Sequence, residues 1–352
     1  MSAPRAATLP DGQAGQAGQA GQARSAPAGK QLLIETKRFA HEDRRLSWWY
    51  LLSTYALLLG SVALAIQPLR WPLRTAASVV EALLVVRTFM LFHDYLHGAI
   101  LRDARVAGWL LNAFGYFVMT PPRNWRQTHN YHHAHTAQVV GSHVGSFAIL
   151  TTSLWPTVTP MQRLSYRVTR HPVTVALGMV TIFVWGMVLA PFVKDPKKHL
   201  EAIGTVAVHA LLAFGLIHFF GVMAWVHVVL IPLAIAHAMG GYLFYAQHNF
   251  PGMHIEPRQT WDYTRAALES SSYLKTGPVL QWFTGNIGFH HVHHLNPSIP
   301  FYRLPEAMAA LPELQNPGTT TMHPRDIASC FRLKLWDGAT GQMVGYPPTD
   351  QA

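Results

Sequence analysis

The sequence has a single cysteine, Cys330, among its 352 residues. An internal disulfide needs two cysteines and thiolate zinc sites need several, so the sequence excludes both. Charge is also scarce, at 12% of the residues, whereas 50% of the residues are hydrophobic. Soluble domains carry about 25% charged residues, so this balance indicates a membrane protein.

Motifs for redox cofactors are missing as well. No GxGxxG follows a strand, and the sequence has neither the haem-binding motif HPGG nor a cysteine cluster. We therefore expect no flavin, nicotinamide, cytochrome or iron–sulfur site within the chain. The net charge of +10 is spread around the hydrophobic segments instead of forming one basic stripe. This distribution favours membrane lipids over nucleic acid as a partner.

The two ends of the chain differ from its centre. The first 30 residues repeat Gly-Gln-Ala and have few bulky apolar side chains, which predicts a disordered tail that we extend to residue 40. The tail lacks the apolar centre of a secretory signal, and an organelle transit peptide stays an alternative. We expect a membrane domain over residues 41–315 and a cytosolic C-terminal tail over residues 316–352.

Four apolar stretches are long enough to cross a bilayer, since a helix of about 20 residues spans about 30 Å. They cover residues 47–67, 75–92, 203–220 and 222–246, which predicts two helical hairpins. Glu81 and Arg87 lie inside the second stretch. We expect both to face the interior of the bundle, with the interface as the alternative for Arg87.

A fifth apolar stretch, residues 173–193, is assigned by requiring all histidine motifs to lie on one side of the membrane. Basic residues before the first span place the N-terminus inside, and Lys194, Lys197 and Lys198 mark the following loop as cytosolic. We therefore expect residues 173–193, and the shorter run 106–120, to re-enter or to lie in the interface. The predicted fold is all-α, with four transmembrane helices and a cytosolic helical cap.

Histidine is abundant, with 21 residues, and three motifs repeat it at helical spacing. HDYLH has histidines at i and i+4, whereas HNYHH and HHVHH have them at i, i+3 and i+4, on one face of a helix. Imidazoles aimed at a common point are typical metal ligands. The eight residues are His93, His97, His129, His132, His133, His290, His293 and His294.

Eight imidazoles exceed the three or four protein ligands of one zinc ion, so we expect two metal ions. His248 follows the last span at the same depth, and we add it as a ninth ligand. Imidazole suits several metals, and iron is preferred because a site at the membrane face suits O₂ chemistry on apolar C–H bonds. Asp94 and Asn286 are expected to orient imidazoles from outside the ligand set, with plain structural roles as the alternative.

The other histidines are expected to stay outside the metal site. His135, His143 and His291 lie off the ligand faces, so we expect outer hydrogen bonds or solvation for them. Interhelical hydrogen bonds or interface positions are expected for the histidines of the last hairpin. These are His209, His218, His227 and His237.

The order HDYLHG, HNYHH, QH after the last span and WFTGNIGFHHVHHLNPSIPFYRLPEA resembles the membrane fatty acid desaturases, specifically the bacterial acyl-lipid omega-6 type. The likeness covers about residues 45–310 and implies the same nine histidine ligands. It also implies two iron ions, O₂ as co-substrate and an external electron donor such as ferredoxin or cytochrome b5. The implied reaction forms a cis double bond in a fatty acyl chain linked to a lipid or held as a thioester.

Several alternatives stay open. The segment AHTAQVVGSHVGSFAIL departs from the usual family pattern, which leaves the head group and the bond position undecided. Hydroxylation of an acyl chain, an alkane or a carotenoid is the nearest rival reaction. A metal-binding transporter is the rival of another class, although its polar residues would lie at the bilayer midplane.

The expected location is a membrane, with a bacterial inner membrane preferred and the site facing the cytosol. Five arginines are expected to form a basic cytosolic face that attracts either an acidic electron donor or lipid phosphates. They are Arg123, Arg126, Arg163, Arg167 and Arg170.

Overall fold

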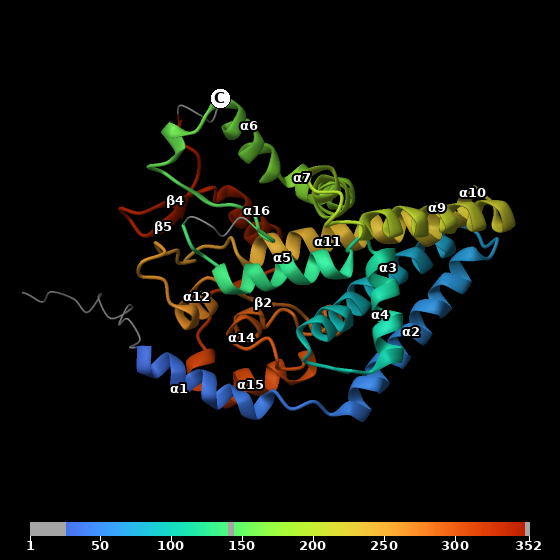
Figure 1. Ribbon diagram of the computed structural model, residues 1–352, viewed down its shortest axis with the longest axis horizontal. Helices are drawn as coiled ribbons and strands as arrows, with labels where there is room; N and C mark the ends of the chain where they lie inside the picture. Colours follow the sequence, from blue (N-terminus) through green and yellow to red (C-terminus); the bar gives the residue numbers. More distant parts are fainter. Residues whose placement is uncertain (1–25, 140–143, 349–352) are drawn as a thin grey trace, which may run out of the picture.

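The computed structural model describes residues 26–139 and 144–348. The described chain is mostly helical, as predicted, and its few strands are only two or three residues long. Long helices extend to one side of the molecule, and short helices and the strands gather at the other (Figure 1). The short elements form the cap in which the second and third histidine motifs lie.

Four helices are long and apolar enough to cross a membrane, as predicted. They are α2 (Arg44–Ile66), α3 (Trp71–His97), α9 (Glu201–Phe220) and a continuous last helix over Val222–Gln247. The last helix consists of α10 (Val222–Trp225), the π-helical turn η4 (Val226–Leu230) and α11 (Ile231–Gln247).

Helix α3 is the centre of the bundle. Of its most apolar window, 61% is buried in the protein, against 6% for α9, so α9 mostly faces outward. The helix extends past the predicted end at residue 92 and stops at Gly98, whose φ of 72° is left-handed. Glycine adopts this conformation without steric cost, which explains why the helix ends there. The first histidine motif is therefore the last part of a span.

Glu81 and Arg87 both lie inside the bundle, at 0% and 3% exposure, which agrees with the interior alternative. The Arg87 Nε donates to Thr54 Oγ1 at 3.1 Å, and its guanidinium lies 3.8 Å from the ring centre of Trp282. Arg87 thus connects α3 to α2 and to the segment before the third histidine motif.

The run 106–120 forms α4 (Arg105–Phe117), which is too short to be among the four candidate spans. Its Leu111 and Phe114 are buried, whereas Trp109 on the other face is 83% exposed. Helix α5 (Pro122–His135) follows and lies beside α11 (Figure 1).

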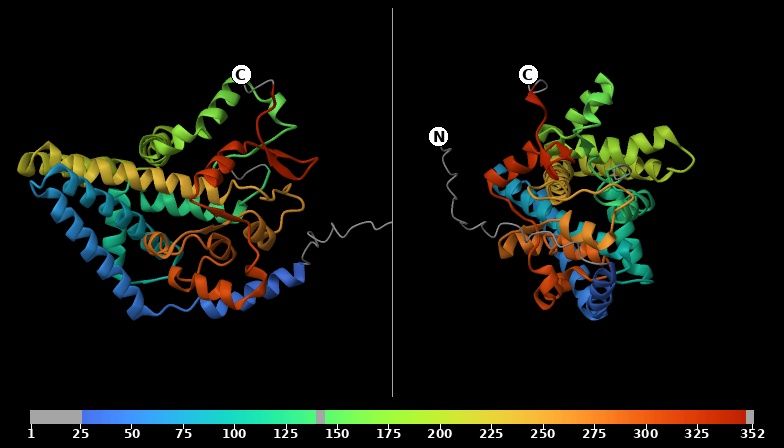
Figure 2. Two further views of the ribbon diagram at one scale, coloured as in Figure 1. Left: turned by 180° about the vertical axis from the view of Figure 1, so that it is seen from behind. Right: turned by 90° about the vertical axis from the view of Figure 1, so that its left-hand side faces the viewer.

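Residues 173–193 form α7 (Pro172–Ala176), the π-helix η3 (Met179–Leu189) and α8 (Ala190–Lys194). Figure 1 shows this segment end-on beside α11, and the quarter-turned view of Figure 2 shows it side-on while α11 is end-on. The segment is therefore roughly perpendicular to α11. This orientation supports the expectation that it does not cross the membrane, and its depth in the bilayer stays a prediction.

The N-terminal prediction is wrong for residues 26–40, and residues 1–25 lie outside the described residues. Helix α1 (Ala26–Thr36) and the turn η1 (Lys37–Phe39) precede the first span. Leu32 and Phe39 are buried in the main hydrophobic core, at 4% and 3% exposure. The apolar residues after residue 30 therefore suffice to attach this segment to the cap.

The predicted C-terminal tail is a packed part of the cap. Strand β3 (Thr319–Thr321) pairs in parallel with β2 (Tyr273–Lys275), and β4 (Leu335–Asp337) pairs with both β1 (Leu150–Thr151) and β5 (Gln342–Val344). Cys330 of α16 (Pro324–Arg332) is fully buried. A boundary at residue 315 therefore does not separate two structural units.

The remaining short helices complete the cap. They are η2 (Trp155–Thr157), α6 (Pro160–Thr169), α12 (Tyr263–Glu269), α13 (Pro278–Phe283), α14 (His290–Leu295), η5 (Phe301–Arg303), α15 (Leu304–Ala310) and η6 (Pro312–Leu314).

Candidate metal centre

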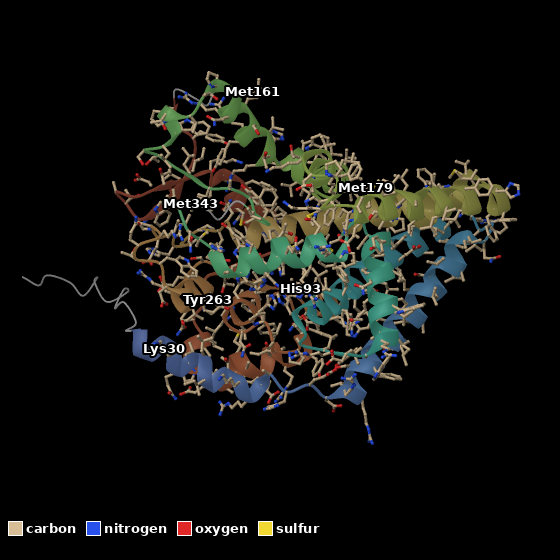
Figure 3. The ribbon with its side chains drawn as sticks, viewed as in Figure 1. Lys30, His93, Met161, Met179, Tyr263 and Met343 are labelled. Carbon is tan, nitrogen blue, oxygen red and sulfur yellow. The ribbon has the colours of Figure 1, made fainter. Side chains whose placement is uncertain are left out.

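The nine histidines selected from the sequence come together in two groups. Within each group, one ring nitrogen of every member lies within 4.8 Å of those of the others. The first group has five members, His93, His97, His129, His133 and His293, and the second has four, His132, His248, His290 and His294. All are buried except the half-buried His97. Figure 3 shows His93 in the interior of the molecule, whereas Met161 lies at its edge.

Helix α5 contributes to both groups. Its residues His129 and His133 are one turn apart and face the first group, while His132 faces the second. The six-residue helix α14 divides in the same way, with His293 in the first group and His290 and His294 in the second. Each HxxHH motif therefore bridges the two groups, so the motifs hold the groups next to each other.

His248 lies at the end of α11, where the backbone leaves the helix with a φ of −125°. Its Nδ1 is 3.0 Å from the carbonyl oxygen of Ser270, and its Nε2 is 3.0 Å from His132 Nε2 and 2.9 Å from His290 Nε2. A carbonyl only accepts, so Nδ1 carries the proton that it donates to Ser270. In the neutral ring, the His248 Nε2 then carries no proton, and its lone pair faces the second group.

Asp94 gives His93 the same arrangement. Its Oδ1 is 3.0 Å from His93 Nδ1, and its Oδ2 accepts from the backbone N–H of Phe301 at 2.7 Å. The proton of His93 is thereby held at Nδ1, and the bare Nε2 lies 3.1 Å from His129 Nε2. These contacts are compatible with the outer-shell role expected for Asp94, which stays a prediction.

Burial keeps the imidazoles outside the membrane helices neutral. Desolvation lowers the pKa of His129, His132, His133, His290, His293 and His294 well below 6.5. For His248, burial lowers the pKa to about 4. Neutral imidazole is the form that binds metal ions.

The donor set fits metal ions. Two nitrogens that bind one ion at right angles, each about 2.1 Å from it, lie about 3 Å apart. Paired histidine Nε2 atoms within the groups are separated by 2.9 to 3.1 Å, which matches this distance. The Nε2 atoms of His97 and His294 are buried without a hydrogen-bond partner among the described residues. A cation in each group would satisfy these lone pairs together.

Asn286 does not orient an imidazole. Its φ is 56°, it lies before α14 begins at His290, and its Nδ2 donates to the carbonyl of Phe301 at 3.0 Å. The expectation assumed that the helix extends one turn further back. Asn286 instead holds the segment before the third motif against the loop that follows it, which is the structural alternative.

Four other described histidines bond backbone carbonyls. His209 and His237 bond the carbonyls of Phe117 and Val118, which agrees with the interhelical role expected for them. His291 bonds the carbonyl of Leu314 and His135 that of Tyr131. His143 lies outside the described residues.

The predicted basic face is smaller than expected. Arg170 is 1% exposed and donates to the carbonyl of Ala148 and to Asn249 Oδ1, so it is a core residue. Arg163 and Arg167 are half-buried beside the Trp155 ring. Arg123 and Arg126 of α5 are exposed.

A cavity of about 180 Å³ reaches the histidines from the side of α11. His93, His129 and His290 line it at the metal centre, together with Gln247. Its other walls are mostly apolar and come from α3, α5, η3 and α11, with Val85, Phe89, Phe183, Met187, Leu243 and Phe244 among them. Such a cavity suits a flexible apolar molecule.

Sequence reasoning missed two contributors to the site. Trp125 lies one turn before His129, and the two rings stack with their centroids 4.2 Å apart. Their i, i+4 spacing in the sequence could have predicted this contact. The segment η3 supplies part of the cavity wall through Ile182, Phe183 and Met187. That contact depends on tertiary packing, and the local sequence has no sign of it.

Comparison with known proteins agrees with this architecture. The model of the family described as fatty acid desaturase matches residues 69–325. A fatty acid desaturase of Bacillus subtilis is 31% identical over 327 residues, which are 90% of each chain. The sn-1 oleoyl-lipid 12-desaturases of Synechocystis and Anabaena variabilis are 26% and 24% identical, over 74% and 79% of this chain and 72% and 79% of their own. The chain therefore belongs to the fatty acid desaturase family of oxidoreductases.

Proposed function

We propose that the chain is an O₂-dependent desaturase that forms a cis double bond in a lipid-linked fatty acyl chain at a pair of iron ions. The observation that carries the proposal is the apolar cavity that reaches both histidine groups. An acyl chain in this cavity would place one of its C–C bonds next to the metal centre.

The nine histidines would hold the two ions, five ligands on one side and four on the other. When bound, iron supplies the activation of O₂ that removal of hydrogen from an unactivated methylene requires. In the overall reaction two hydrogens leave adjacent carbons, and O₂ takes them up with two external electrons and two protons to give two waters.

The protein's own residues position the substrate and exclude water. Val85 and Phe89 of α3 and Leu243 and Phe244 of α11 line the cavity, so apolar side chains would confine the chain. Holding the reacting bond in a fixed place removes much of the entropic part of the barrier. Asp94 and Ser270 fix the tautomers of His93 and His248 before any ion binds.

The form of the substrate is inferred from relatives. The Synechocystis and Anabaena proteins are named for acting on oleoyl lipids, and they match this chain over most of their length. We therefore favour an acyl group esterified in a membrane lipid over a soluble thioester. Lateral entry from the bilayer would suit a cavity that lies between membrane helices.

The electrons have to come from a separate protein. Arg123 and Arg126 are exposed on the helix that carries the second histidine motif, which makes this end of α5 the preferred contact for an acidic carrier such as ferredoxin or cytochrome b5. Lys194, Lys197 and Lys198 support a site that faces the cytosol, because basic residues flank spans on that side, and a bacterial inner membrane is the preferred location.

The test is expression in a host that has only simple saturated and monounsaturated lipids, followed by analysis of fatty acid methyl esters. We expect a new double bond with the wild-type chain and none with His293→Ala, which removes a ligand of the five-membered group. If hydroxylated fatty acids form instead of a double bond, the proposed desaturation is wrong and the same site catalyses oxygenation. Absence of any product from metal-loaded protein with a working electron donor would reject the acyl-chain substrate.

A further inference from the structure

The cavity continues well beyond the metal centre. On α11 its lining begins at Ala236 and ends at Gln247, next to the ligand His248. Eleven residues of helix correspond to about 16 Å. The cavity therefore has a far end near Ala236 and His237, and the residues that form this end limit how far a bound chain can extend.

The wall at the far end comes from η3, which is fixed closely against α11 by two glycines. A Cβ on Gly178 would lie 2.8 Å from the carbonyl oxygen of His237, and one on Gly241 would lie 3.0 Å from Ile182 Cδ1. The first distance is to backbone and excludes any side chain at Gly178 in this packing, whereas an added Cβ at Gly241 would force the Ile182 side chain to shift. The Asn124 Nδ2 also donates to the carbonyl of Met187 at 2.9 Å, which attaches η3 to α5.

Phe183 and His237 meet where these elements pack. Their rings stack with centroids 4.0 Å apart and planes at 25°. The His237 Nε2 donates to the carbonyl of Val118 at 3.1 Å, at the end of α4. Three elements thus hold the ring pair in place, and both rings line the cavity.

Gly240 leaves space beside this pair. It lines the cavity, and a Cβ added to it would lie 4.0 Å from Phe183 Cζ, an ordinary contact distance. A methyl group at this position would occupy cavity volume without a backbone clash. Alanine also favours the helix over glycine, so Gly240→Ala should fold.

We propose that Phe183, His237 and Gly240 form the stop for the terminal methyl group of the acyl chain, and so determine how many carbons separate that methyl from the reacting bond. The inference rests on the proposed function. Most polar side chains that line the cavity lie at or near the metal end: His93, Thr128, His129, Gln247 and His290. At the far end, the N–H of His237 donates to the carbonyl of Val118. The apolar end of the substrate therefore suits the far end.

Two substitutions should act in opposite directions. Phe183→Ala enlarges the far end, so longer chains should be used, or the double bond should form further from the methyl end. Gly240→Ala reduces the space, so shorter chains should be preferred, or the bond should form closer to the methyl end. One methylene in an apolar pocket changes selectivity by about 10-fold or more, which sets the expected change in the ratio of products.

Each variant has a matched control outside the cavity. Trp185→Ala removes another large ring from η3, one that is 58% exposed. Gly215→Ala adds a methyl group to α9, where nothing lies within 4 Å of the added Cβ. Both controls should keep the wild-type product pattern.

The experiment expresses the five chains with fatty acids of graded length and measures chain length and double-bond position of the products by mass spectrometry. If the chain length or double-bond position of the products shifts in opposite directions in Phe183→Ala and Gly240→Ala, the result supports the proposed stop. Wild-type patterns in both variants would overturn the inference while leaving the proposed function intact. A wild-type chain that forms no double bond would reject the proposed function itself, and the inference with it.

Discussion

At the scale of single residues, the carboxylate of Asp94 is the most informative group outside the nine histidines. It accepts from His93 Nδ1 with one oxygen and from the N–H of Phe301 with the other, so it connects the first histidine motif to the loop after the third. An asparagine has only one acceptor oxygen and cannot satisfy both donors. Metal affinity should therefore depend on the charge and on both oxygens of Asp94.

We expect Asp94→Asn to weaken metal binding by about 10–100-fold, the usual effect of losing such an outer partner. The measurement is the rate at which a chelator removes metal from the purified protein. Asp103→Asn is the matched control, because the Asp103 side chain is 92% exposed. Equal rates for the two variants would mean that Asp94 does not support the ligand His93.

Much of the site could be predicted from histidine spacing, and the exceptions have physical causes. The i, i+3, i+4 pattern predicts which imidazoles share a face, and the structure gathers all nine selected residues. The division of each HxxHH motif between two groups depends on how α5 and α14 pack, which spacing alone does not show. Asn286 was misassigned because α14 begins only at His290.

At the scale of elements, the C-terminal segment packs against the last membrane helix. Cys330 of α16 is fully buried in a cluster with Tyr245 and Phe250. Burial raises the pKa of its thiol to about 12, so the reactive thiolate is rare at neutral pH.

We expect Cys330 in the folded protein to resist a maleimide at neutral pH and to react fully once the chain is unfolded. As the only cysteine of the chain, it gives an unambiguous signal in a mass measurement of the labelled protein. Rapid labelling of the native protein would show that residues 316–348 are not packed as described.

Arg87 connects three elements through directional contacts. Its Nε bonds Thr54, its plane lies over the Trp282 ring, and it also donates to the Trp282 carbonyl. A lysine keeps the charge but has neither the planar group nor the fork of donors.

Arg87→Lys should therefore destabilise the fold by about 1.5–3 kcal/mol, the scale of hydrogen bonds to a charged group. The readout is the thermal midpoint of the detergent-solubilised protein. Arg102→Lys, at a side chain that is 79% exposed, should leave the midpoint unchanged. If Arg87→Lys unfolds at the same midpoint as the wild-type chain, the directional contacts of Arg87 do not stabilise the fold.

Local patterns predicted the long helices but not how the ends of the chain pack. Four spans follow from apolar length, and their bounds differ mainly at α3, which continues to His97. The C-terminal strands could not be predicted, since β4 pairs with β1 and β3 with β2 across long stretches of sequence. The three-residue strands have too little local pattern to reveal such pairing.

At the scale of the whole molecule, four crossings require both ends and all histidine motifs to lie on one side of the membrane. The turn between α9 and α10 should lie on the other side. Because Cys330 is buried, introduced cysteines can report the two faces without removing it.

Ser298→Cys, beside the third motif, and Met223→Cys, in α10 directly after the turn at Gly221, are both at exposed positions. In intact cells and inverted vesicles, a membrane-impermeant maleimide should label them from opposite sides, with Ser298→Cys reached from the cytosol. Labelling of both from the same side would contradict the four-span topology.

The central claim is that nine histidines hold two iron ions, and metal analysis of the purified chain tests it most directly. We predict two iron ions per wild-type chain, the same content in His291→Ala, whose imidazole bonds the Leu314 carbonyl, and loss of iron in His248→Ala and His293→Ala. A chain filled with zinc, a content of one ion, or iron that both ligand variants retain would contradict the account.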